Sequence, residues 1–313
     1  MNRYVRSFWM GCMSVVFFPS ALLSCDICGC SSATFGMGLL PGQPQHFVGL
    51  QWTQRGYTST HRTLFANETP IVTRELLQEV DVAGRWSISR RWQLSGKLSY
   101  RMASSEGTDQ NLSTQQAGDP SLMIMRVFGD VSDTLCQRMR HVWMGGMGIE
   151  IPLVPSRLRD AKGEVMPTLL QPGSGSWDPL LRVAYIGTSD RQGWLVELQS
   201  MLSTYRKNGD RRGHQCSLSA RYHRRWRLRA DWAVIPHASV AADLIGREWM
   251  DQRYNNDSGG AVVYVRPGLD ITYRSIAFRG YVQCPAWSRL SDGLVVPEAP
   301  LHISLIYLIQ NKK

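Results

Sequence analysis

The sequence predicts an all-β protein, an antiparallel up-and-down transmembrane β-barrel of about 12 strands. Two observations carry this prediction: apolar and polar residues alternate over many short segments, and the connections between those segments are alternately short and long. The alternation is complete over residues 91–102, where Leu98 and Tyr100 alternate with Lys97 and Arg101. A period of two residues is that of a strand with one apolar face and one polar face. In a membrane barrel the apolar face contacts lipid and the polar face lines the lumen.

The lengths of the connections indicate how such a barrel is oriented. The long connections cover residues 56–73, 103–117, 152–175, 238–258 and 284–300, and residues 206–212 form a shorter member of that series. Outer-membrane barrels have short periplasmic turns and long external loops, so an even number of strands places both termini in the periplasm. The predicted strands cover residues 46–55, 74–89, 91–102, 118–129, 138–151, 176–187, 193–205, 213–223, 225–237, 259–273, 276–283 and 301–309.

The first part of the chain has the character of a secretory signal peptide. Arg3 and Arg6 precede an apolar run over residues 8–23. That run is shorter than the roughly 20 residues that a spanning helix requires, and no other segment approaches it, which excludes a helical membrane protein. We therefore expect a signal peptide over residues 1–24, a cysteine-rich periplasmic segment over residues 25–44, and a barrel over residues 45–313 in the outer membrane of a Gram-negative bacterium.

Composition and charge favour a membrane partner over a nucleic acid. Eleven Trp and eleven Tyr accompany only 8 Phe, and amphipathic rings concentrate at membrane interfaces. Trp86, Trp92, Trp194 and Trp226 lie near predicted short turns on the predicted outward face, where they would form a periplasmic girdle. The net charge of +10 comes without a nucleic-acid-binding motif, so a cationic lumen or rim explains it better. The expected partners are outer-membrane lipid, a small-molecule solute and the barrel-assembly machinery, with no nucleic acid.

Charged residues occupy predicted inward positions on several strands. Buried charges must be paired or hydrated, so these residues form either a salt-bridge ladder that rigidifies a narrow barrel or a cationic channel. The ladder is the favoured role for most of them. The candidates for lining the lumen are Glu79, Asp81, Arg85, Lys97, Arg101, Glu197, Arg221, Arg227, Arg229, Asp231 and Arg279, with Glu75 and His223 beside them.

A cysteine motif opens the predicted mature chain, where Cys25, Cys28 and Cys30 form a Cys-x-x-Cys-x-Cys pattern. Three thiolates can bind a soft metal such as Cu(I) or Zn(II), although three ligands do not close a structural zinc site. In an oxidising compartment two of the thiols can instead form a disulfide. Residues 22–24 also approximate a lipoprotein cleavage site, which would make Cys25 an acylated first residue. The sequence leaves these three interpretations open.

The sequence contains no Gly-x-Ser-x-Gly elbow, His-Glu-x-x-His pair, phosphate-binding loop or dinucleotide fingerprint. We therefore expect a channel or transporter for a small solute rather than an enzyme, with residues 25–44 as a plug or as a metal or redox site. The alternatives are a membrane-anchored protein for metal handling or redox sensing, and a barrel enzyme that acts on lipid. Glycines in residues 173–176 most simply serve a turn, although a loop that folds into the lumen needs the same flexibility.

Several stretches carry a family resemblance, namely residues 25–32, 38–41, 46–50, 118–119, 151–153 and 172–176. Through them the sequence resembles a family of uncharacterised outer-membrane, transporter-like β-barrel proteins whose mature chains begin with Cys-Asp-hydrophobic-Cys-Gly-Cys. It is also distantly similar to barrel transporters linked to the meta-pathway of phenol degradation. The resemblance implies a barrel in the outer membrane and a transport role with no settled substrate.

Overall fold

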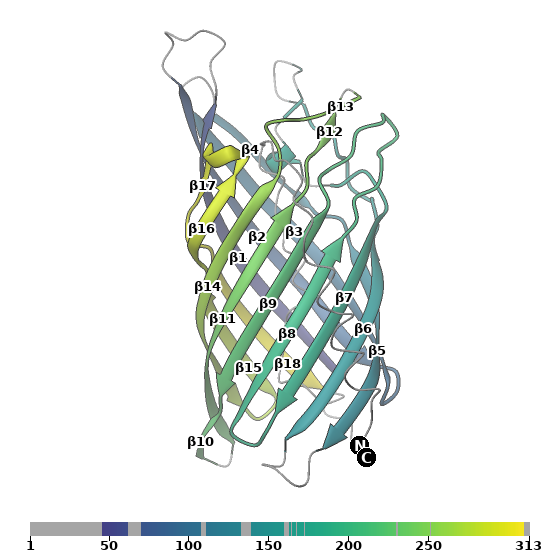
Figure 1. The fold of residues 1–313 in the computed structure, drawn as a ribbon, viewed down its shortest axis with the longest axis vertical. Helices are drawn as coiled ribbons and strands as arrows, with labels where there is room; N and C mark the ends of the chain where they lie inside the picture. The colour runs from purple at the N-terminus through teal and green to yellow at the C-terminus, as the bar shows by residue number, and fades with distance from the viewer. Residues whose placement is uncertain are drawn as a thin grey trace, which may run out of the picture.

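Twelve antiparallel strands close a β-barrel in the part of the chain that the computed structural model describes (Figure 1). That part covers residues 46–61, 70–107, 111–132, 139–159, 163, 165–166, 168–171, 173–229, 231–250 and 252–309. Barrel neighbours follow the chain order and the last strand pairs with the first, which confirms the predicted up-and-down topology. The barrel strands are β1 (His46–His61), β2 (Ile71–Ser87), β3 (Trp92–Gly107), β5 (Ser121–Ser132), β6 (Arg140–Glu150), β7 (Asp178–Thr188), β8 (Gln192–Met201), β9 (Gln215–Arg224), β11 (Trp232–Ile245), β14 (Gly260–Tyr273), β15 (Ile276–Val282) and β18 (Leu301–Ile309).

Most of the remaining strands lengthen the barrel hairpins. β16 continues β15 and pairs with β14, whereas β17 leads into β18 and pairs with β1. In the same way β10 continues β9 and pairs with β11, and β4 folds back on β3. These elements are β4 (Asn111–Ala117), β10 (Trp226–Arg229), β12 (Trp249–Met250), β13 (Arg253–Tyr254), β16 (Cys284–Leu290) and β17 (Val295–Pro297), with the short 3-10 turns η1 (Thr168–Leu170) and η2 (Ser291–Gly293).

The barrel has two unlike ends (Figure 1). At the turn end β1 begins, β18 ends, and short connections join β2 to β3, β7 to β8 and β14 to β15. The opposite end is the loop end, and the described parts of three of its connections that we predict to be loops, residues 56–73, 103–117 and 284–300, are largely strand. Beyond the thickness of a bilayer both faces of a hairpin contact water, so the alternation that marks a strand is lost there.

One predicted strand is displaced along the chain. The alternation predicts a strand over residues 225–237 after a one-residue connection at Arg224, but β11 begins at Trp232. Arg227 and Arg229 belong instead to β10, which extends β9 toward the turn end before the chain reverses. Because β10 carries the same alternation that a new strand would carry, the sequence pattern places the turn too early.

The outer face of the barrel is apolar and the inner face is polar, as the alternation predicts. Leu98 is 61% exposed on the outer face, while its neighbour Lys97 is buried on the inner face. Exposed Trp residues lie near both ends, in the two bands that are typical of membrane barrels. Among the residues described, no helix has the length and hydropathy of a membrane-spanning helix. The bands contain Trp86, Trp92, Trp194 and Trp226 near the turn end, and Trp177 and Trp287 near the loop end.

Candidate functional site in the barrel lumen

A cluster of ion pairs on β1, β2 and β3 is centred on Glu79, which is 1% exposed. Its Oε1 lies 3.4 Å from the Nζ of Lys97 and 3.5 Å from the Nε of Arg101, and its Oε2 lies 3.5 Å from Arg55. Lys97 also lies 3.4 Å from the Oδ1 of Asp81. Strand register creates this cluster, because Arg101 lies directly opposite Glu79, Arg55 lies diagonal to Glu79, and Lys97 lies diagonal to Asp81. The two carboxylates offset two of the three positive charges named here.

Two further groups of ion pairs lie on the inner wall, one on β14 and β15 and one on β7 and β8. Arg279 on β15 donates two hydrogen bonds to the carboxylate of Asp270 on β14, at 2.7 and 2.5 Å. The Nε2 of His237 lies 3.2 Å from the same carboxylate. On β7 and β8, Arg182 and Glu197 approach to 2.5 Å. Most lumen cations are therefore paired within the protein.

The structure places most of the predicted lumen residues on the inner wall. Glu75, Glu79, Asp81, Lys97, Glu197, His223 and Arg279 are buried there, and Arg85, Arg101 and Arg221 are half-buried on the same face. The prediction is wrong for Arg227 and Asp231, which are exposed at the turn end because the chain reverses after β10. Arg229 belongs to the same β10 segment, and Asp231 pairs at 3.2 Å with Arg274 in the next turn.

The connection between β6 and β7 is held closed at its base by one carboxylate, that of Asp119. Its Oδ1 accepts hydrogen bonds from the backbone N–H groups of Leu153 and Val154, both at 3.0 Å. Its Oδ2 accepts from Ser174, through the backbone N–H at 2.5 Å and the hydroxyl at 2.9 Å. The Nε of Arg206 donates to the carbonyl of Ser174 at 2.7 Å. Asp119 therefore joins the start of this connection to its end, and we name this set of contacts the Asp119 clamp.

Glycine is required where the two legs of this connection meet. A Cβ at Gly173 would overlap the carbonyl oxygen of Val154, so only glycine allows the two backbones to approach this closely. Gly175 has a φ of +70°, and a Cβ there would overlap the Oγ of Ser156. Both glycines fall in the stretch 173–176, whose flexibility the sequence analysis singled out.

Buried polar contacts fasten the clamp to the barrel rim. Asp178, the first residue of β7, accepts hydrogen bonds at 2.8 Å from the Ser176 hydroxyl and from the Thr204 backbone N–H. Arg212, from the connection between β8 and β9, lies 3.1 Å from Glu150 and 3.5 Å from Asp178. Burial lowers the pKa of the Arg206 guanidinium, and the neighbouring positive charge of Arg212 lowers it further.

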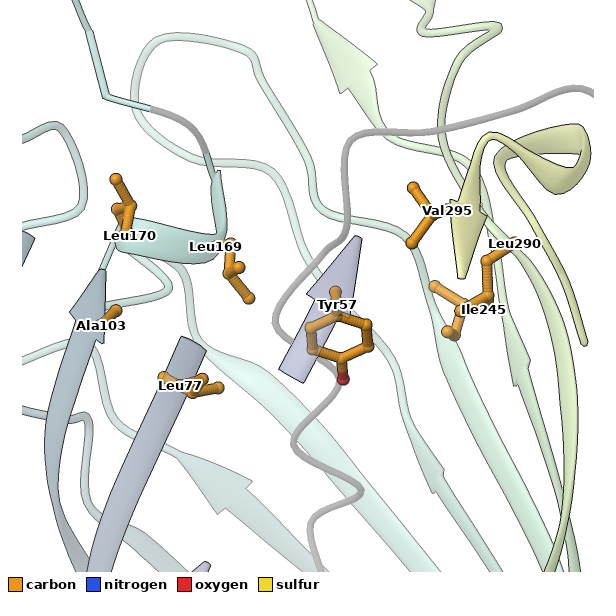
Figure 2. Packing of buried hydrophobic residues seen from close by; sticks show 8 residues of the cluster. All are labelled: Tyr57, Leu77, Ala103, Leu169, Leu170, Ile245, Leu290 and Val295. Atoms are coloured by element: carbon orange, nitrogen blue, oxygen red, sulfur yellow. The ribbon is translucent and has the colours of Figure 1, made fainter. Parts of the chain in front are cut away.

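The clamped connection packs its apolar tip inside the loop end of the barrel (Figure 2). Leu169 and Leu170 of η1 are buried, and the Thr114 hydroxyl donates to the Leu170 carbonyl at 2.9 Å. The residues around them come from strands on different sides of the barrel, so η1 lies within the lumen. The other members of this cluster are Tyr57, Leu77, Ala103, Ile245, Leu290 and Val295. We name the whole set the apolar collar.

The sequence singles out both sides of the Asp119 clamp, but it does not predict that they contact each other. Asp119 and the stretch 172–176 carry the family resemblance, but alternation and spacing do not indicate that they touch. The contact joins residues that are 55 positions apart through a buried carboxylate. An acid at the second position of the predicted strand 118–129 is the only local signal of such a clamp.

The predicted cysteine site lies outside the described residues. Cys25, Cys28 and Cys30 therefore remain a prediction, as does a Cu(I) or Zn(II) ion bound to them. Cys216 and Cys284, within the described part, are free thiols. In that same part, no group of His, Cys, Asp and Glu side chains is arranged to hold a metal ion.

Comparison with known proteins gives structural neighbours but no family. No family model and no curated protein matches the sequence. The structure is similar to the COG4313 outer membrane channel from Pseudomonas putida F1, with a TM-score of 0.57 and 10% identity over 87% of this chain and 100% of that chain. The β-domain of the Bordetella autotransporter Brka gives 0.47 at 11% identity, covering 85% and 100%. A Pseudomonas aeruginosa FadL homologue gives 0.43 at 8% identity, covering 92% and 99%. At these identities the first likeness establishes the fold, that of an outer-membrane β-barrel.

Proposed function

We propose that the protein is an outer-membrane channel or transporter for a small solute in a Gram-negative bacterium. The observation that carries the proposal is the combination of a charged, ion-paired inner wall with a clamped connection inside the loop end. A barrel that served only as an anchor would not require a polar interior, because apolar side chains fill a closed barrel at less cost in desolvation. The charged wall supports contact with a hydrated solute, and the apolar collar supports control of its passage.

Orientation follows from the two unlike ends. β1 begins and β18 ends at the turn end, where the connections are short. Outer-membrane barrels keep their short turns in the periplasm, so we place both chain termini there and the apolar collar toward the exterior. Folding of such a chain in the outer membrane requires the barrel-assembly machinery, which is its expected protein partner.

The cysteine segment is the proposed regulatory part of the channel. Cys30 precedes the first strand residue, His46, by 16 positions, and an extended segment of that length spans about 50 Å. That reach would allow residues 25–44 to cover the periplasmic mouth or to enter the lumen. Binding of Cu(I) or Zn(II), formation of a disulfide, or acylation of Cys25 would each fix the segment in a different way.

The test is single-channel conductance of the purified full chain in planar bilayers. Asp119→Asn replaces one acceptor oxygen of the clamp with an NH₂ group, which would face N–H and O–H donors. The loss weakens the clamp, because hydrogen bonds to a charged group contribute about 1.5–3 kcal/mol each. We expect the loop to be released and the conductance to rise or to fluctuate. Asp130→Asn is the matched control, because Asp130 pairs with Arg140 at the exposed turn end.

Two results would contradict the proposal. Recovery of the protein as a soluble monomer without detergent, instead of a heat-modifiable β-rich band, would exclude a membrane barrel. Absence of conductance in the parent, in Asp119→Asn and in a chain that lacks residues 25–44 would exclude a channel. Equal conductance in Asp119→Asn and the parent, with both correctly folded, would show that the clamp does not limit passage.

A further inference from the structure

Two arginines on the inner wall lack the acidic partner that the other lumen arginines have. Within the described residues, no hydrogen bond or ion pair joins Arg85 of β2 or Arg221 of β9 to any group. The Nε of Arg85 is buried without a partner, and its guanidinium lies 4.9 Å from the centre of the Phe47 ring. Both side chains point inward, because the residues on either side of Arg221 are exposed and Trp86, next to Arg85, faces outward.

These two arginines face one ion pair from different strands. Arg85 is close enough to Arg182 to be repelled by its charge, and Arg221 interacts with Glu197. Arg182 and Glu197 are themselves in contact at 2.5 Å. Arg279, which is paired with Asp270, adds further repulsion on Arg221. Arg221 is attracted by the carboxylates of both Asp270 and Glu197, and Arg182 pairs with Glu197, whereas no carboxylate among the described residues forms an ion pair with Arg85.

Among the described residues, the turn-end half of the lumen has fewer negative than positive charges. The inward-facing ionised groups described there include the arginines Arg85, Arg182, Arg221 and Arg279 and the carboxylates Glu197 and Asp270. Removing a cation from water without a counter-charge is costly, and an anion that enters the lumen would offset that cost. The cluster around Glu79 in the other half contains two carboxylates, so the excess of cations there is smaller.

We propose that Arg85 and Arg221, together with Arg182, form a binding station for a small carboxylate anion in the turn-end half of the lumen. The planar guanidinium fork matches a carboxylate bidentately, which favours this ligand over a spherical halide. Phosphate shares the chemistry and is the competing ligand. The station deepens the proposed channel function, since it assigns anionic solutes to that channel. It lies below the apolar collar, so a solute from outside would meet the collar first.

Binding is measured first, without conduction, by titrating succinate, acetate or phosphate into the detergent-purified full chain in a calorimeter. We expect succinate to bind the parent and binding to be lost in the double variant Arg85→Gln/Arg221→Gln. Arg74→Gln is the matched control, because Arg74 is exposed at the loop end and pairs with Glu298. Neither lumen arginine forms an ion pair with another described residue, so the double variant should leave no described carboxylate without its partner and should fold as stably as the parent. Arg85→Lys keeps the charge without the fork and should weaken binding of succinate more than binding of chloride.

Selectivity is measured second, as the reversal potential in bilayers under a KCl gradient. Arg85→Gln removes one charge about 6 Å from the ion path, which in a water-like dielectric disfavours chloride about threefold and favours potassium about threefold, so the chloride-to-potassium permeability ratio should fall about tenfold. Conductance with unchanged selectivity and no succinate binding would overturn the station and leave the channel function standing. Succinate binding that is lost in the double variant, in a protein that never conducts, would leave the station standing and overturn the channel. Binding of phosphate alone would overturn the carboxylate assignment.

Discussion

Glu79→Gln measures how far the ion pairs of the lumen are shielded from water. Gln keeps the size of the side chain and removes the negative charge that contacts Arg55, Lys97 and Arg101. Glu79 is 1% exposed, so the three cations cannot recover hydration by a small movement of that side chain. The variant therefore converts a paired cluster into a buried excess of positive charge.

The magnitude follows from the burial of this cluster. Breaking a buried ion pair costs about 3–5 kcal/mol, whereas an exposed pair contributes about 0–1 kcal/mol. Glu298→Gln is the matched control, because the Glu298 side chain is 40% exposed and lies 3.1 Å from Arg74 outside the lumen. The free energy of unfolding is measured by reversible urea unfolding in lipid vesicles, followed by Trp fluorescence. We expect a loss of several kcal/mol for Glu79→Gln and a loss under about 1 kcal/mol for the control.

A second substitution shows whether the loss is electrostatic. Lys97→Met in the Glu79→Gln background removes one of the three cations that contact Glu79 and should restore part of the lost stability. Equal, small losses for Glu79→Gln and Glu298→Gln would refute the reasoning, since they would show that bulk-like water screens the cluster. The ion-pair cluster would then contribute little to the rigidity of the barrel.

Three further predictions concern the lipid face, the clamp and the cysteines. Leu98→Arg should impair assembly more than Lys97→Leu, because a charge at the bilayer midplane costs about 2–4 kcal/mol. Equal folding yields for the two variants would show that the inner and outer faces of β3 are misassigned. Gly173→Ala should separate the legs of the clamped loop and speed its cleavage by an externally added protease. Gly280→Ala is the control, because the nearest atom to a Cβ at that position lies 4.0 Å away. Cys28→Ser/Cys30→Ser should abolish Cu(I) binding by the purified chain if the motif is a metal site; unchanged binding would leave a disulfide or acylation as its role.

The sequence predicts the barrel well where lipid and lumen impose opposite demands on alternate residues. Lys97 and Leu98 illustrate this, because one faces ion pairs and the other faces the outside, so their order alone fixes the phase of β3. The strand number and the closure of the barrel follow from repetition of that pattern. Where both faces meet water the pattern disappears, and the predicted loop over residues 284–300 is in fact the hairpin of β16 and β17.

The clamp and the unpaired arginines depend on tertiary contacts that alternation does not encode. In the sequence Asp119 is recognisable only as one residue of a short motif, because its contact with Ser174 forms only in the folded protein. Arg85 and Arg279 look alike in sequence, since both are arginines at inward positions of strands. They differ in the structure because Asp270 lies next to Arg279 in the strand register, and no acid occupies the corresponding place beside Arg85.

The seam between β1 and β18 constrains when the protein can fold. Nine register pairs join β1 to β18, from His46 with Ile309 to Gln54 with Leu301. The first strand of the barrel therefore cannot complete its pairing until the last strand is present. Until then both edge strands expose unpaired backbone groups that hydrocarbon cannot satisfy. A chain truncated before Leu301 would leave that seam open and would be a substrate for periplasmic proteases. Contacts of such long sequence separation also make closure of the barrel slow.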